Sequence, residues 1–276
     1  MKILVLILYT FRELLSRATL VVLAGISTLV IALTMLSISM SESSEGVTLQ
    51  MFGNPISPPL PADAVGEFVR TSQVGLSKGL FIGIIFLGVF ATAGIVPATL
   101  RKGTIDLYLS KPLGRWELLL GKCLGAIAVM FVNVLYFIGA IWLTYGVKVG
   151  VWNSGFLFSS FSITFVFACL YSLIAFLAVL SRGSPIPIIG AFLYLFVIGG
   201  LLESREQVLY LISENTLYRS LIDGLYYVMP QISAMQAGIT NQIMETSINW
   251  KPFVQSILSA GLFFGVGVAV LSRRDF

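Results

Sequence analysis

The chain has 276 residues, of which 57% are hydrophobic and 11% are charged, and its mean hydropathy is +0.94. Because an ordinary soluble domain carries roughly 25% charged residues, this composition excludes a soluble protein and predicts an integral membrane protein. The chain has no histidine and only two cysteines, Cys123 and Cys169. It therefore offers neither a histidine-based metal site nor a disulfide framework.

The N-terminal residues 1–17 combine an apolar stretch with Lys2, Arg12, Glu13 and Arg17. This mixture predicts an amphipathic helix that lies at the membrane surface, with its basic side chains among the lipid head groups. The alternative is that the same residues simply lengthen the first membrane-spanning helix.

Six apolar runs approach the roughly 20 residues that a helix needs to cross a bilayer. They are uniformly apolar, whereas the strands of a membrane barrel alternate. The sequence thus predicts an all-α membrane protein with a single transmembrane domain over residues 1–276 and six spans. The runs are Leu20 to Met40, Leu76 to Leu100, Leu118 to Tyr145, Phe156 to Leu180, Ile186 to Leu202 and Phe253 to Leu271.

The distribution of basic residues predicts the orientation, since Lys and Arg concentrate on the cytoplasmic side of membrane proteins. With the N-terminus inside, eleven of the seventeen fall in cytoplasmic segments, and most acidic residues fall outside. Both termini are therefore expected in the cytoplasm, and the net charge of +4 reflects orientation rather than nucleic-acid binding. The eleven are Lys2, Arg12, Arg17, Arg101, Lys102, Lys111, Arg115, Lys122, Arg182, Arg273 and Arg274.

Two segments on the outer side are long. Residues 41–75 contain four prolines within "GNPISPPLP", which disfavours a regular helix and predicts an ordered but irregular extracytoplasmic loop. Residues 203–250 contain three apolar stretches with helical spacing, each too short to span. They predict short or re-entrant helices on the outer leaflet, or alternatively a partly folded loop.

Chemistry that would power or catalyse a reaction is absent. The spans hold almost no ionisable residue, no phosphate-binding loop of the form G-x-x-x-x-G-K-[ST] occurs, and no nucleophile–base set is present. The sequence predicts neither an enzyme nor a cofactor site in this chain. Asn133, Thr34 and Ser37 interrupt the apolar pattern, and they are candidates for a translocation path, although an intramembrane Asn more often joins helices.

The segment "RKGTIDLYLSKPLGRWELLLGK" between the second and third spans is the most polar of the chain. Ile105, Tyr108 and Leu109 share one helical face, and Pro112 and Gly114 then break the helix. The pattern predicts a cytoplasmic helical elbow over residues 101–117 that presents an apolar knob with a basic rim. A solvated basic loop is the alternative, but it does not explain the apolar spacing.

This segment resembles the cytoplasmic loop of permease subunits from the type 2 superfamily of ABC exporters. The N-terminal elbow, the six spans, "YYVMP" and the terminal "RRDF" resemble that family too. Six-span members include the copper-enzyme maturation exporters of nitrous oxide reductase. The residues that carry the likeness are Gly103, Thr104, Ile105, Asp106, Leu107, Ser110, Lys111, Pro112, Leu113, Arg115, Trp116, Glu117, Gly121 and Lys122.

The resemblance implies a type V ABC exporter fold in a bacterial or archaeal inner membrane. Two permease copies would pair, as a homodimer in the simplest case, and two separate ATPase subunits would bind ATP and Mg. The chain would then couple ATP hydrolysis to export, or transmit force to a periplasmic partner protein. The coupling interface it implies is Arg101, Lys102, Gly103, Thr104, Ile105, Asp106, Tyr108, Leu109, Lys111, Pro112, Arg115 and Trp116.

Overall fold

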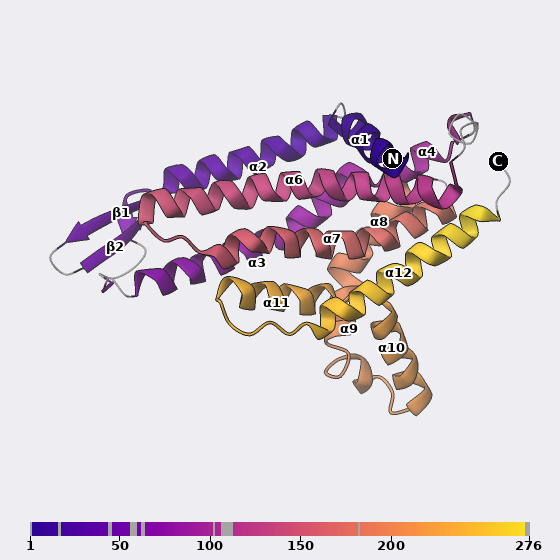
Figure 1. Ribbon diagram of the computed structural model, residues 1–276. Coiled ribbons are helices and arrows are strands. Elements are labelled where there is room, and N and C mark those ends of the chain that lie inside the picture. The colour runs from indigo at the N-terminus through magenta and orange to yellow at the C-terminus, as the bar shows by residue number, and fades with distance from the viewer. Residues whose placement is uncertain are drawn as a thin grey trace.

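The computed structural model describes residues 2–15, 18–43, 46–55, 60–61, 64–101, 103–105, 113–181 and 183–273. These residues form an elongated bundle of helices with a small sheet at one end (Figure 1). Helix α1 (Lys2–Leu15) and the last turns of α12 (Lys251–Ser272) lie at the opposite end. We call these the hairpin end and the terminal end of the bundle.

Five helical stretches are long and apolar enough to cross a membrane: 65–99, 115–149, 154–181, 185–203 and 251–272. Helix α2 (Ala18–Ser37) is also apolar, but its apolar stretch, Val21–Ser37, is shorter than each of these five. The mostly helical architecture agrees with the predicted fold class, and the count of six spans stays a prediction in which α2 would supply the sixth. The stretches comprise α3 (Val65–Thr92) with α4 (Ile95–Thr99), α6 (Arg115–Val149), α7 (Ser154–Ser181), α8 (Pro185–Leu193) with η1 (Tyr194–Ile198) and α9 (Gly199–Glu203), and α12.

Helix α7 lies at the centre of the bundle, and it packs against α3, α6, α8, α11 and α12. Phe167 and Tyr171 stack on one of its buried faces, and the Tyr171 hydroxyl donates a hydrogen bond to the Thr92 carbonyl at 3.0 Å. Next to this pair, α3 and α6 approach closely at Gly88, where an added Cβ would lie 2.5 Å from the Met130 sulfur. The core is therefore shaped by small residues that admit large neighbours.

The hairpin end carries a three-stranded antiparallel sheet of β1 (Ile38–Ser43), β2 (Gly46–Met51) and β3 (Asn54–Pro55). Strands β2 and β3 are joined by Phe52 and Gly53, both with positive φ, as a two-residue type I′ turn requires. The sheet continues directly from α2, so Phe52 N also donates to Ser37 O at 2.8 Å.

Residues 41–75 thus differ from the expected irregular loop. Among the described residues of this segment, 41–43 and 46–51 lie in strands, and 65–75 belong to α3, which begins at Val65. The physical reason for the early helix start is that Val65, Val69 and Gln73 form a buried stripe at i, i+4 and i+8. This stripe comes before the uniformly apolar run that begins at Leu76, and the span was predicted from that run alone.

The segment before α12 contains η2 (Leu209–Leu211), α10 (Thr216–Val228) and α11 (Ile232–Ile243). Helix α11 lies against α7 and α3, whereas α10 projects from the side of the bundle (Figure 1). The Asn215 side chain caps α10 by accepting a hydrogen bond from Leu217 N at 3.0 Å. On α10, Leu217 and Leu221 are each 74% exposed, which leaves an apolar helix face without protein cover among the described residues.

Candidate functional site

The connection from α4 to α6 begins with a tight turn at the terminal end of the bundle. The amides of Thr104 and Ile105 both donate to the Arg101 carbonyl at 3.1 Å. Gly103 adopts a φ of +86°, which favours glycine over any residue with a Cβ. Arg101, Gly103 and Thr104 are exposed, and Ile105 is buried. The turn therefore presents a polar surface that is anchored by one apolar side chain.

Half of the predicted coupling interface lies outside the described residues: Lys102, Asp106, Tyr108, Leu109, Lys111 and Pro112. The predicted knob of Tyr108 and Leu109 is thus neither placed nor tested. Trp116, on the first turn of α6, is described and is half exposed.

The first turn of α6 is fixed by two charged side chains. The Glu117 carboxylate accepts a hydrogen bond from the Gly114 amide at 2.8 Å, as in a capping box. Arg115 Nη1 donates to the carbonyls of Leu271 at 3.0 Å and Ser272 at 2.8 Å. These carbonyls end α12, where the helix dipole favours a cation. Arg115 therefore joins the start of α6 to the end of α12.

Helix α1 is attached to the next turns of α6 by an ion pair. Lys122 Nζ lies 2.8 Å from Glu13 Oε2 and 5.1 Å from the centre of the Tyr9 ring. The Lys122 side chain is only 2% exposed, although it belongs to an apolar helix. A buried ammonium group requires a partner of opposite charge, so this pair fixes the position of α1 on α6.

Small residues on α6 let α1 approach further. A Cβ added at Gly121 would lie 2.7 Å from Leu6 Cβ, and one at Gly125 would lie 2.5 Å from Thr10 Cβ. Thr10 is fully buried, and its hydroxyl donates to Leu6 O at 2.8 Å within α1. Gly121 and Gly125 have the spacing of two small residues one helical turn apart, which permits close helix packing.

The three candidate path residues are not gathered into one site. The hydroxyls of Thr34 and Ser37 donate to the carbonyls of Val30 and Thr34 in their own helix, at 2.8 and 3.1 Å. Asn133 lies on α6, and its side-chain oxygen accepts a hydrogen bond from Ser27 at 3.3 Å. Asn133 contacts α2 at Ser27, whereas Thr34 and Ser37 lie nearer the hairpin end of that helix.

Asn133 also belongs to the lining of an open groove between α1, α2 and α6. The groove has a volume of about 420 Å³ and is mostly apolar. Its other polar groups are Thr28 and Tyr136, whose hydroxyls lie 3.1 Å apart. The remaining lining residues are Phe11, Val21, Ala24, Val129 and Val132.

A buried polar network joins α3, α7 and α11 near the hairpin end. Asn153 caps α7 by accepting from Phe156 N at 3.2 Å, and its amide nitrogen donates to Gln73 Oε1 at 2.7 Å and Ile243 O at 3.0 Å. A second pair, Arg70 and Glu245, lies 2.6 Å apart and is partly exposed. The network fixes α11 to the bundle.

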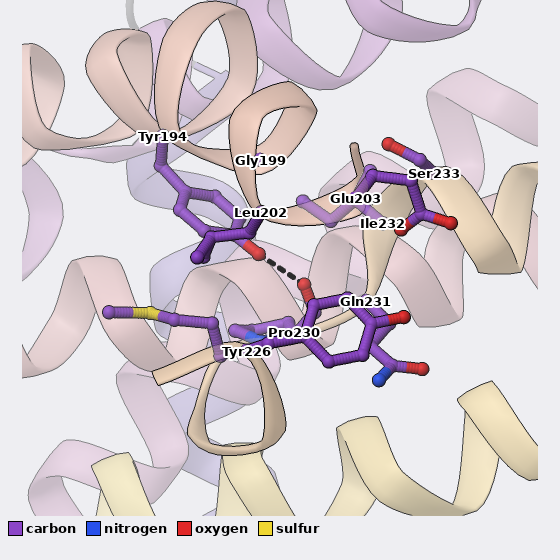
Figure 2. Close-up of a pocket in the computed structure, with 10 residues that line it drawn as sticks. Tyr194, Gly199, Leu202, Glu203, Tyr226, Pro230, Gln231, Ile232 and Ser233 are labelled. Carbon is purple, nitrogen blue, oxygen red and sulfur yellow. Dashed lines mark hydrogen bonds between the residues drawn. The ribbon is translucent and has the colours of Figure 1, made fainter. Parts of the chain in front are cut away.

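The spanning stretch 185–203 contains a π-helical segment, η1, beside Pro230. Figure 2 shows the Tyr194 ring pointing toward Pro230, and the Tyr194 hydroxyl donates to the Pro230 carbonyl. The cavity between them measures about 10 Å³, which is space for about one water molecule. This contact is therefore a packed joint between η1 and the loop that leads from α10 to α11.

A charged cluster holds the base of α10. Asp223 Oδ1 accepts hydrogen bonds from the Tyr210 hydroxyl at 2.6 Å and from Arg205 Nε at 2.8 Å. These bonds stabilise the carboxylate, so they hold the pKa of Asp223 below its usual range. The hydrogen bond from the Tyr210 hydroxyl to Asp223 also raises the pKa of Tyr210. Arg205 also lies 3.8 Å from the centre of the Tyr226 ring.

Sequence reasoning missed the pairing of Glu13 with Lys122 and the network around Asn153. It grouped Lys122 with the basic residues of the cytoplasmic segments, because counting Lys and Arg does not separate buried from exposed cations. Two signals were present in the sequence. Lys122 is a single cation near the start of an apolar helix, and Gly121 and Gly125 stand on either side of it at helix-packing spacing.

In this membrane protein, the polar side chains described above join one helix to another. The chain matches the family model described as "ABC-2 family transporter protein" over residues 4–276. No curated protein matches the chain. The protein therefore belongs to the ABC-2 family of transporter proteins, and it is a multi-pass integral membrane protein. Membrane components of this family normally work with separate ATP-binding cassette subunits and are generally not catalytic.

Proposed function

We propose that the chain is the permease subunit of an ATP-driven exporter, in which two copies pair and two ATPase subunits dock at the terminal end. The observation that carries this proposal is the family match over almost the whole chain, together with the bracing found at the terminal end. An apolar path with a few hydroxyl and amide groups, Asn133, Thr34 and Ser37 among them, suits an apolar or amphiphilic substrate.

The mechanism follows from what the start of α6 touches. Arg115 binds the end of α12, and Lys122 binds α1 through Glu13. A force applied to the turn at Gly103 and to the segment after it would reach α6 at its first turn. Because buried ion pairs and tight glycine contacts resist separation, α1, α6 and α12 would tilt together. ATP-driven closure of the ATPase subunits would supply that force.

The proposed orientation places the terminal end in the cytoplasm and the hairpin end outside the inner membrane. The bias of Lys and Arg supports it. Helix α2 would be the sixth span, and α1 would be the elbow helix at the cytoplasmic surface. Residues 101–117 would then be the coupling segment, with Lys102, Asp106, Tyr108, Leu109, Lys111 and Pro112 as its expected contact residues.

Two glycines provide a matched test. Gly103 and Gly53 both have positive φ, at +86° and +80°, and no atom of the described residues lies within 4 Å of a Cβ added at either. Replacing either by valine strains a surface turn by about 1–3 kcal/mol without filling the core. We expect Gly103→Val to lower the ATP hydrolysis that co-purifies with the tagged chain from its native membranes, at equal amounts of chain. Gly53→Val should leave it unchanged, and equal effects of both variants would contradict the proposal.

A second candidate function is transmission of force to a periplasmic protein. The observation that favours it is the sheet at the hairpin end, which continues from α2 and extends beyond the helices there (Figure 1). It predicts that a periplasmic protein co-purifies with the chain and is lost when β1 and β2 are replaced by a short linker. Retention of substrate transport by that variant would favour the exporter instead.

A further inference from the structure

Two hollows adjoin at the end of the spanning stretch 185–203. One is the cavity of about 10 Å³ beside Tyr194 (Figure 2), and the other is an open pocket of about 500 Å³. Glu203 and Ser233 belong to both linings, so the pocket leads to the small cavity past these two residues. The pocket is lined by Gly200, Glu203, Ser204, Glu206, Gln207 and Ser233.

The hollows carry negative charge that is not balanced. No Lys or Arg is found among the described residues that line them. Arg205 lies 3.7 Å from Glu206 but 2.8 Å from Asp223, which is its main partner. Among the described residues, none forms a hydrogen bond or ion pair with the Glu203 side chain. Glu203 also ends a helical stretch, where the helix dipole favours a cation.

Gln231 presents an unpaired amide to the small cavity. It is 7% exposed, and it lines that cavity with Glu203. Its side chain neither caps α11 nor bonds to another described residue, whereas its backbone amide donates to Ser256 Oγ at 3.0 Å. The side-chain atoms are not among the fully enclosed polar atoms that lack a partner, so they face the cavity. Because a buried amide needs a hydrogen-bond partner, the cavity suits a polar group.

Both hollows lie at the level of the membrane surface. Glu203 ends one spanning stretch, and Ser256, which Gln231 contacts, lies in the second turn of α12, near the start of another. The ends of spans reach the head-group layer, where lipid head groups and dissolved amines are both within reach. A primary ammonium group is about the size of a water molecule. It therefore fits the small cavity, whereas a trimethylammonium group is too large.

We propose that the two hollows form a binding site for a primary ammonium group. The ammonium occupies the small cavity and donates hydrogen bonds to the Glu203 carboxylate and the Gln231 side-chain oxygen. The rest of the ligand lies in the open pocket, where Glu206 adds a second negative charge. The ethanolamine head group of a phospholipid and a dissolved amine both carry such a group. The inference stands apart from the proposed function, because it requires neither transport nor an ATPase.

The test titrates the full chain, purified in detergent and stripped of lipid, with phospholipids that share their acyl chains and differ in head group. Native mass spectrometry counts the bound lipid. We expect the ethanolamine lipid to bind at least about tenfold more tightly than the choline or glycerol lipid, which cannot donate charged hydrogen bonds. If instead only dissolved ethanolamine or spermidine raises the thermal unfolding midpoint, the site holds and its ligand is soluble. Equal binding of the three lipids with no effect of dissolved amines would overturn the proposal.

Variants assign the binding to named residues. Glu203→Gln keeps the shape of the side chain and removes its charge, so it should weaken amine binding at least about tenfold, and Gln231→Leu should weaken it about fivefold. Glu214→Gln changes an exposed carboxylate outside both linings and should have no effect. Unchanged binding of the glycerol lipid shows that the variants are folded. If Glu203→Gln and Glu214→Gln act alike, or if Ca²⁺ binds at Glu203 and amines do not displace it, the proposal fails.

Discussion

Replacing Glu13 by glutamine should release helix α1 from α6. The variant leaves the Lys122 ammonium buried without its carboxylate partner, which lies 2.8 Å away in the wild type. Breaking one side of a buried ion pair costs about 3–5 kcal/mol. The Tyr9 ring, 5.1 Å from Lys122 Nζ, would retain about 1 kcal/mol of this through a cation–π contact. The net cost is about 2–4 kcal/mol, so the undocked population should rise about 30-fold to about 700-fold.

Thiol labelling can measure this release. Thr10 is fully buried against Gly125, so Thr10→Cys, in a background with Cys123→Ala and Cys169→Ala, reacts only when α1 moves away. We expect Glu13→Gln to accelerate the reaction by the factor given above. Arg70→Gln, which breaks the partly exposed pair at the hairpin end, is the control and should leave the rate unchanged. An acceleration below about threefold, equivalent to less than about 1 kcal/mol, would refute the reasoning.

Three further predictions concern packing, capping and pH. Gly121→Val should lower the thermal stability of the detergent-solubilised chain by about 1–3 kcal/mol through overpacking, because its Cβ would lie 2.7 Å from α1. Gly139→Val on the same helix should be neutral, since a Cβ there meets no described residue within 4 Å. Equal unfolding midpoints of the two variants would contradict this. Asn153→Ala should cost about 2 kcal/mol by removing the α7 cap and its buried bonds, and an unchanged midpoint would argue against the network. The folded-state pKa of Asp223 is lowered by its bonds from Tyr210 and Arg205, so their contribution is present above the ordinary pKa of about 4 and is lost as pH falls through the folded-state pKa. Hydrogen exchange of α10, corrected for intrinsic rates, should therefore stay slow down to about pH 4 and become faster only below it; faster exchange on raising the pH above neutral would exclude this assignment.

The spanning helices were predictable because apolar runs of sufficient length can satisfy their backbone only as helices in lipid. Their ends were less predictable. Helix α3 begins at Val65, within a polar stretch, since Val65, Val69 and Gln73 are buried by neighbours that no local pattern reveals. Helix α2 ends at Ser37, and the following residues pair as strands. Strand pairing depends on a partner segment, so hydropathy alone could not predict it.

The candidate site was predictable where it depends on local backbone. Gly114 was predicted to interrupt the helix, and α6 begins directly after it at Arg115. The turn at Gly103, where φ is +86°, was not predicted. The polar contacts that join the helices were not predictable, because the two residues of each contact are distant in sequence. Glu13 and Lys122 are separated by 109 positions, and Gln73 and Asn153 by 80. Each pair contains one residue that looks ordinary in isolation, and only the fold brings the two together.

The central claim is that an ATPase subunit binds the turn at the terminal end of the bundle. It is tested most directly by placing a photoreactive benzophenone amino acid at Thr104, which is exposed in that turn, and at Phe52, which is 65% exposed in the hairpin. Irradiation of membranes that contain the chain and its ATP-binding cassette partner should join the ATPase to position 104 and not to position 52. Cross-linking from position 52 alone, or from neither position in a complex that hydrolyses ATP, would contradict the claim.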